Sequence, residues 1–232
     1  MDIRRLQRRF IMSFDNYEQA SLLYWKMAKE SNFIDDSALL EQLWKCMGTT
    51  KRYVCLSCPE SMHLELTAMA ISFFHEGCDM SDIFDSLHIA ESPSYTIHLN
   101  RHYVFSLDMI GGLDCSSKVQ TWLGRIEMSL FDDLCEAFPK IKLDINKPIT
   151  VNLRRVTELT GKRFIFMLNN WDRVFQMPFM ESTESQNEYL NFLEVFFYNQ
   201  SFCELALLIG NKPITDFANT TSMFTNLKWP DC

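Results

Sequence analysis

Glycine and proline are scarce in this sequence, with seven of each among 232 residues. Disordered chains are enriched in both residue types and poor in hydrophobic ones. Here hydrophobic residues make up 47% of the chain and charged residues 22%, which is typical of a globular protein. A chain of this length buries a sizeable core without disulfides or metals, so we expect a folded protein.

Basic residues are also in short supply. Lysine and arginine number 22 against 30 acidic residues, for a formal net charge of -8. A general nucleic-acid binder needs a basic surface that displaces counterions, so direct nucleic-acid binding is not expected. An acidic surface suits instead a protein that docks on a basic protein partner.

The sequence has no long apolar run. None approaches the roughly 18 residues of a membrane span. The basic stretch from Arg4 to Arg9 is not followed by an apolar segment before Asp15, so it is not a signal peptide. These absences predict no membrane association and a cytoplasmic protein.

A second cysteine pair is missing as well. Cys55 and Cys58 have the C-x-x-C spacing, and His63, His75 and Cys78 follow, but a zinc site needs another pair at similar spacing. We therefore predict no metal site. Most of the eight cysteines lie in apolar segments, where a reduced thiol acts as a small hydrophobe.

What the sequence does contain is an alternation of strand and helix patterns. Continuous apolar runs, typical of strands covered on both faces, occupy residues 51–57, 102–108, 162–168 and 204–210. Helical spacing of apolar residues marks 37–47, 64–74, 116–138 and 186–198. This order predicts a three-layer α/β fold with a mostly parallel central sheet flanked by helices.

In parallel sheets ligands bind at the carboxyl ends of the strands. The loops after Ser57, Asp108, Leu168 and Gly210 are therefore the segments to inspect for chemistry. Short motifs in and between these loops follow one another in a recognisable order; they lie at 33–37, 53–59, 77–79, 83–90, 161–166, 171–172, 189–193 and 210–214.

In their amino-acid sequence and in their order, these motifs resemble the bacterial AAA-ATPase-like family. Its members are P-loop proteins often fused to a PD-(D/E)XK nuclease-like domain. The resemblance covers about residues 32 to 229. It implies that the three-layer fold is P-loop NTPase-like, with a degenerate AAA-ATPase-like domain over 32–232 preceded by an N-terminal helical extension over 1–31.

The resemblance fails where this family binds phosphate. After its first strand the family carries the turn Arg-Pro-Arg-Arg-Phe-Gly-Lys-Ser/Thr, whose glycine, lysine and hydroxyl hold phosphate and magnesium. The corresponding residues here are Cys58, Pro59, Glu60, Ser61, Met62, His63, Leu64 and Glu65. His63 stands for the glycine, Leu64 for the lysine and Glu65 for the hydroxyl residue, so a carboxylate would repel the phosphates.

The later strands depart from the family in the same way. The family ends its third strand with Asp-Glu-x-Asp, which holds magnesium and activates the attacking water. Here Asn169 and Asn170 take the first two positions, and an amide cannot act as a general base. Only Asp172 remains of the acidic group, and Asn211 occupies the sensor-like position after the fourth strand. The comparison implies no hydrolysis and no cofactor.

Two further features leave alternatives open. Met177, Pro178, Phe179 and Met180 form an apolar stretch in a predicted loop, and Trp229 lies near the C-terminus. These residues are either buried loop packing or a partner-binding patch. A new acid/base pair of His63 and Glu65 is a weaker interpretation than helix capping at the start of an apolar helix.

Family members usually continue into a helical lid and often into a nuclease-like domain, and we expect neither part here. Our leading hypothesis is a catalytically inactive protein-interaction module, a regulator or inhibitor of a larger complex, for instance an anti-defence protein of a mobile element. The alternative is a pseudo-ATPase that binds nucleotide without hydrolysis. The two differ in whether ATP or ADP stabilises the protein.

Overall fold

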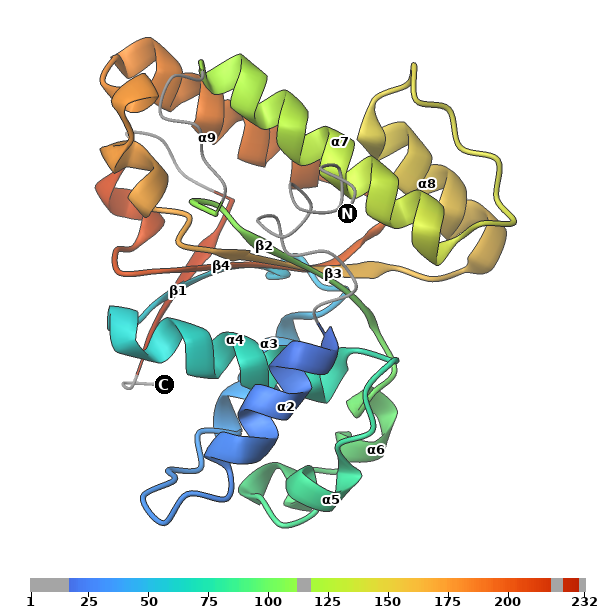
Figure 1. Cartoon of the computed structure of the whole chain (residues 1–232), viewed down its shortest axis with the longest axis vertical. Helices are drawn as coiled ribbons and strands as arrows, with labels where there is room; N and C mark the ends of the chain where they lie inside the picture. The colour runs from blue at the N-terminus through green and yellow to red at the C-terminus, as the bar shows by residue number, and fades with distance from the viewer. Residues whose placement is uncertain (1–16, 112–117, 218–222, 230–232) are drawn as a thin grey trace, which may run out of the picture.

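A computed structural model describes residues 17–111, 118–217 and 223–229. At its centre is a sheet of five parallel strands in the order β2-β3-β4-β1-β5 (Figure 1). The strands are β1 (Tyr53–Ser57), β2 (Tyr103–Asp108), β3 (Phe164–Asn169), β4 (Cys203–Gly210) and β5 (Thr225–Lys228).

Helices cover both faces of the sheet and give the predicted three layers (Figure 1). One face carries α2 (Tyr17–Met27), α3 (Ala38–Cys46), α4 (Glu60–Phe74), α5 (Ser81–Phe84) and α6 (Tyr95–His98). The other face carries α7 (Val119–Ala137), α8 (Ile149–Thr160) and α9 (Thr183–Phe197). Short 3-10 turns complete the fold: η2 (His88–Glu91), η3 (Arg173–Gln176), η4 (Pro178–Met180) and η5 (Ile214–Asp216).

The two faces of β1 show why an unbroken apolar strand is needed in the middle of the sheet. Successive side chains of a strand point to opposite faces. Val54 and Leu56 enter the core under α2 to α6, whereas Tyr53 and Cys55 enter the core under α7 to α9. All four side chains are buried, so each face contributes its own hydrophobic stabilisation.

Helix α2, within the predicted N-terminal extension, packs into the first of these layers. Its Tyr24 is 1% exposed and stacks on Phe84 at a ring-centroid distance of 5.3 Å. Helix α2 therefore contributes Ala20 and Tyr24 to the core, while residues 1–16 of that predicted extension lie outside the described residues. Among the described helices, none combines the length and the apolar character needed to cross a membrane.

Candidate functional site

The parallel strands bring the sequence-predicted site positions to one edge of the sheet. Because β1 lies beside β4, and β3 lies on the other side of β4, the ends of these three strands are neighbours. In register, Ser57 pairs with Gly210 and Asp108 pairs with Asn169. The expected convergence at the carboxyl edge is present in the structure.

The connection from β1 to α4 is very short. Only Cys58 and Pro59 separate the strand from the helix, which begins at Glu60. Pro59 has φ -56° and ψ 143°, a backbone conformation that leads directly into a helix. The predicted phosphate-loop positions from Glu60 to Glu65 therefore belong to the first turns of α4, not to a loop whose successive amides surround a phosphate.

His63 closes the space between α4 and the end of β3. Its ring is buried, with 5% of the residue exposed. Nδ1 lies 3.1 Å from Oδ1 of Asn170, and Nε2 lies 3.2 Å from the carbonyl oxygen of Cys58. The amide of Asn170 in turn donates to Asp108 Oδ1 over 2.9 Å. His63, which takes the place of the glycine in the family's phosphate-binding turn, thus links the start of α4 to the ends of β1 and β3.

Asn169 forms a second tie between the same elements. Its Oδ1 accepts a hydrogen bond from Thr67 Oγ1 at 2.6 Å, and its Nδ2 donates to Ser106 Oγ at 3.3 Å. The next residue, Asn170, has φ 57°, the left-handed conformation that asparagine tolerates better than most residues. The side-chain amides of Asn169 and Asn170 therefore hold α4 against the strand ends, and the left-handed backbone of Asn170 turns the chain after β3.

A small crevice remains beside these contacts, and we call it the α4 crevice. Its volume is about 220 Å³, and it is lined by Glu60, His63, Leu64, Thr67, Asp108, Asn169, Asn170 and Arg173. Glu60 forms an ion pair with Arg173 across its rim. Leu64, at the lysine position, is 63% exposed and offers no charge.

Glu65 is not part of this crevice. Burial and the nearby carboxylates of Asp36 and Glu30 raise the pKa of Glu65, which lies on the side of α4 that faces these acidic residues. His63 instead points to the strand ends. The structure therefore does not bring His63 and Glu65 together as an acid/base pair.

Asp172, the one acidic residue at the predicted acidic-strand positions, holds two loops together. It is 4% exposed, and its Oδ2 accepts hydrogen bonds from the backbone N–H groups of Asn211, at 2.9 Å, and Lys212, at 3.0 Å. The backbone of the sensor-like position is thus bound to the loop after β3. This carboxylate acts as a structural tie between the ends of β3 and β4.

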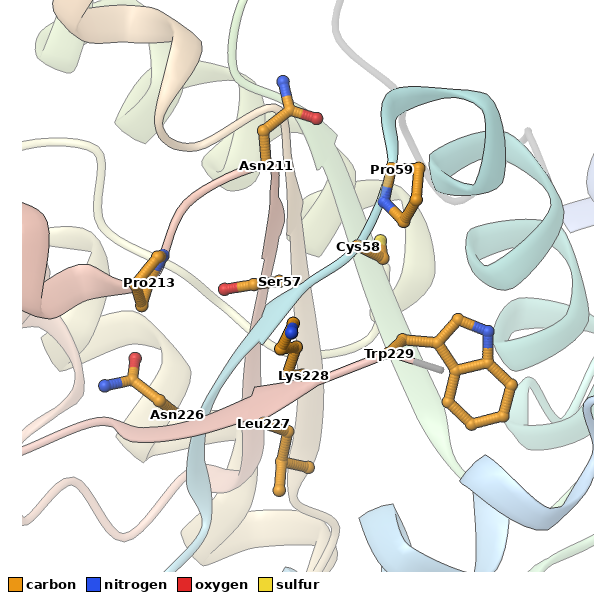
Figure 2. A pocket seen from close by; sticks show the side chains of 9 residues that line it. All are labelled: Ser57, Cys58, Pro59, Asn211, Pro213, Asn226, Leu227, Lys228 and Trp229. Carbon is orange, nitrogen blue, oxygen red and sulfur yellow. The ribbon is translucent and has the colours of Figure 1, made fainter. Parts of the chain in front are cut away.

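A larger pocket lies at the ends of β1, β4 and β5, and we call it the β5 pocket (Figure 2). Its volume is about 670 Å³, and its lining is Ser57, Cys58, Pro59, Asn211, Pro213, Asn226, Leu227, Lys228 and Trp229. Sequence reasoning missed this pocket because it did not find β5. The signal was weak, since every residue of this four-residue strand except Leu227 is exposed.

The apolar stretch after β3 packs inward. Met180 is fully buried, and Phe179 packs on Trp122 at a ring-centroid distance of 5.6 Å. Pro178 is exposed, Met177 is half-buried, and Trp229 is only 8% exposed. Of the two interpretations, buried packing describes Met180 and Trp229. These two side chains are therefore not part of an exposed partner-binding patch.

The cysteines are free thiols at the six described positions, and Cys115 and Cys232 lie outside the described residues. Burial raises the pKa of Cys55 and of Cys58 to about 12, which keeps both thiols protonated and poorly nucleophilic at neutral pH. Within the described part of the chain, no three histidine, cysteine or acidic side chains are grouped so as to hold a metal ion.

Compared with known proteins, the sequence matches no protein-family model and no curated protein. The proposals below therefore rest on this chain's own residues and on the family resemblance of its motifs.

Proposed function

We propose that this chain is a catalytically inactive, P-loop-like domain that works by binding another protein, as a regulator or inhibitor of a larger complex. The observation that carries the proposal is the buried contact of His63 with Asn170 and with the carbonyl oxygen of Cys58. It closes the place where a phosphate loop would open.

Three chemical arguments support the absence of turnover. Helix α4 begins at Glu60, which leaves too short a loop to surround a phosphate with backbone amides. Leu64 supplies no positive charge, and Asn169 and Asn170 supply no general base. The carboxylate of Asp172 already accepts hydrogen bonds from two backbone N–H groups.

Surface properties support binding to a protein. The net charge of -8 favours a partner with a basic surface. Large apolar side chains are exposed on helices of both layers, including Leu22 and Trp25 on α2 and Leu159 on α8. Such side chains are typical of interface cores when they are covered by a partner.

A pulldown from host lysate, with the purified chain as bait and with ATP present or absent, tests the proposal. We expect one stoichiometric protein, captured equally in both conditions, and no hydrolysis of ATP by the bait. Capture only with ATP, or measurable ATP turnover, would contradict the proposal and favour the nucleotide-binding alternative.

Two surface variants make this experiment sharper. The double variant Leu22→Ser/Trp25→Ser changes one helical layer, and Leu159→Ser changes the opposite one. All three residues are exposed, so both variants should fold as the parent does. Loss of capture in one variant and not in the other locates the partner on that layer, whereas non-specific adsorption would weaken in both.

A further inference from the structure

Helix α2 packs against α4 on one face of the sheet, and carboxylates gather beside this contact (Figure 1). Glu30, Asp35 and Asp36 follow α2 along the chain, and Glu65 lies on α4. Burial raises the pKa of Glu65, and the carboxylates of Asp36 and Glu30 are close enough to raise it further. We call these four residues the acidic cluster.

Within the described parts of the chain, no ion pair includes a member of the acidic cluster. Asp35 is held by the backbone, since its carboxylate accepts hydrogen bonds from the N–H groups of Ser37, at 2.9 Å, and His88, at 2.7 Å. Asp36 and Glu65 are both half-buried, and burial and the charge of Asp35 raise the pKa of Asp36. Like charges are thus held together with limited access to water, which favours the binding of a cation.

The hydroxyl of Tyr24 adds an independent observation at the same place. Its ring is held by Phe84, at a ring-centroid distance of 5.3 Å, and by Phe33, at 6.1 Å. Burial, together with three carboxylates of the acidic cluster, raises the pKa of Tyr24, so its oxygen lies near them. Tyr24 is 1% exposed, and no group of the described residues hydrogen-bonds this oxygen. A buried hydroxyl without a partner is costly, and it has hydrogen-bonding capacity left for a ligand.

Exposed apolar side chains are chain neighbours of the acidic cluster. Ile34 precedes Asp35 and is 70% exposed, and Leu64 precedes Glu65 and is 63% exposed. Trp25, on α2, is 41% exposed. A free inorganic cation gains nothing from such side chains, whereas a protein covers them as it binds. The surroundings therefore favour a cation that belongs to a protein.

The spacing of the carboxylates favours a guanidinium over a metal ion. Within the described part of the chain, no three acidic, histidine or cysteine side chains are grouped closely enough to hold a metal. A guanidinium presents five N–H donors in a plane and is more weakly hydrated than an ammonium. These donors suit two separate carboxylates and the phenol oxygen of Tyr24, which can accept a hydrogen bond.

We propose that the acidic cluster binds an arginine side chain of the protein partner, with Asp36 and Glu65 as its acceptors and the hydroxyl of Tyr24 as a third. Apolar residues beside that arginine cover Ile34 and Leu64. The oxygen of Tyr24 is covered in the free chain, so contact with it follows a side-chain rotation at the cluster. This inference rests on the proposed protein binding and names the chemistry of the partner.

Nuclear magnetic resonance titration with a capped tripeptide of leucine, arginine and leucine tests the binding chemistry directly. The matched probe carries citrulline in place of arginine, because its neutral urea group has nearly the shape of the guanidinium. We expect the arginine peptide to shift the backbone signals of Asp36 and Glu65 and the ring signals of Tyr24, assigned with Tyr24→Phe. The citrulline peptide should bind about fivefold more weakly, since a partly exposed ion pair contributes up to about that factor.

Two double variants separate the acidic cluster from the effect of net charge. Asp36→Asn/Glu65→Gln should reduce binding of the arginine peptide to the level of the citrulline peptide. Asp132→Asn/Glu158→Gln is the matched control, because it removes two charges from exposed residues of α7 and α8, on the opposite face of the sheet. In the pulldown, the first variant should lose most of the captured partner and the control should keep it.

Several outcomes would overturn the proposal. They are no shift with the arginine peptide, equal binding of the two peptides, or equal losses in the two double variants. The chain's own arginines, at positions 4, 5, 8 and 9, are the competing occupant. If their replacement by glutamine shifted the signals of Asp36 and Glu65 before any peptide was added, the cluster would bind the chain itself and the proposal would be wrong.

The pulldown distinguishes this inference from the proposed function on which it rests. Undiminished capture by Asp36→Asn/Glu65→Gln would overturn the arginine site and leave the proposed protein binding standing. No capture by the parent chain would contradict both.

Discussion

The carboxylate of Asp172 accepts a hydrogen bond from the backbone N–H of Asn211 over 2.9 Å, and it accepts a second from the next residue, Lys212. The sequence places these residues about 40 positions apart, yet the bond joins the chain segments that follow β3 and β4. The carboxylate of Asp172 is thus engaged in holding this edge of the sheet together.

We expect Asp172→Ala to destabilise the protein by about 1–3 kcal/mol, because two N–H groups lose a charged acceptor inside the fold. Asp172→Asn should cost less, since its amide oxygen still accepts. Urea unfolding followed by circular dichroism measures both. Asp216→Ala, an exposed change, should stay within about 0.5 kcal/mol of the parent. Equal stability of the Ala and Asn variants would refute the hydrogen-bond argument.

Gly210, at the end of β4, is required for the same tie. A Cβ added there would lie 2.5 Å from Asp172 Oδ1 and 2.7 Å from Trp171 Nε1. Both side chains are buried and cannot move freely. We expect Gly210→Ala to cost about 1–3 kcal/mol through overpacking, measured by urea unfolding.

Gly124 provides a matched control of opposite sign. It lies inside α7, and an added Cβ would meet no atom within 4 Å. Gly124→Ala should therefore stabilise the protein by about 0.5–1 kcal/mol, because alanine loses less backbone entropy in a helix. If both alanine variants shifted stability in the same direction, the steric explanation for Gly210 would be wrong.

A half-buried histidine pair should make stability depend on pH. His98 Nδ1 and His102 Nε2 are 3.0 Å apart, and burial lowers the pKa of both rings. Burial, with His98 and Lys162 nearby, lowers the pKa of His102 to about 4. The unfolded chain, with a histidine pKa near 6.5, therefore binds more protons than the folded one between these values.

Stability is then complete above about pH 6.5 and falls as the pH drops toward 4. We expect His102 alone to contribute a loss on the order of 2 kcal/mol between pH 7.5 and 5, read from urea midpoints. His102→Gln should remove this contribution and leave that of His75, whose pKa burial also lowers to about 4, whereas His88→Gln, at an exposed position, should leave the whole dependence unchanged. An unchanged slope in His102→Gln would remove this pair as the cause.

Most of the sheet was predictable because its four longer strands are continuous apolar runs. β5 was not, since a short edge strand with an exposed face carries little hydrophobic pattern. Helix α8 was also missed, although Pro148 before it, Gly161 after it and the spacing of Ile149, Leu153 and Val156 are ordinary helix signals.

The location of the site was predictable from the sequence, but the contacts between its side chains were not. Because parallel strands end at the same edge of a sheet, residues 58–65, 169–172 and 211 could be expected to lie close together. The bond between His63 and Asn170 spans 107 residues of sequence, and no local pattern predicts such a pairing. The start of α4 had a signal in Pro59, which favours a helix beginning directly after it.

Introducing the residues that the AAA-ATPase-like family carries at these positions should not create nucleotide binding. In the triple variant His63→Gly/Leu64→Lys/Glu65→Ser the positive charge and the hydroxyl return, but α4 still begins at Glu60, one residue after Pro59. Only Cys58 and Pro59 connect β1 to α4, and a connection of two residues is too short to surround a phosphate as a phosphate loop does. We therefore expect no rise in melting temperature with ATP and magnesium in either the parent or the variant.

The size of the expected signal makes this prediction decisive. A ligand present at one hundred times its Kd stabilises a protein by about 2.7 kcal/mol, which a thermal-shift measurement detects readily. His63→Gly/Leu64→Ala/Glu65→Ala is the matched control, because it has the same glycine cost in α4 without the new lysine and hydroxyl. A saturable ATP-dependent rise in the triple variant alone would mean that charge, and not the short β1–α4 connection, is what prevents nucleotide binding in this fold.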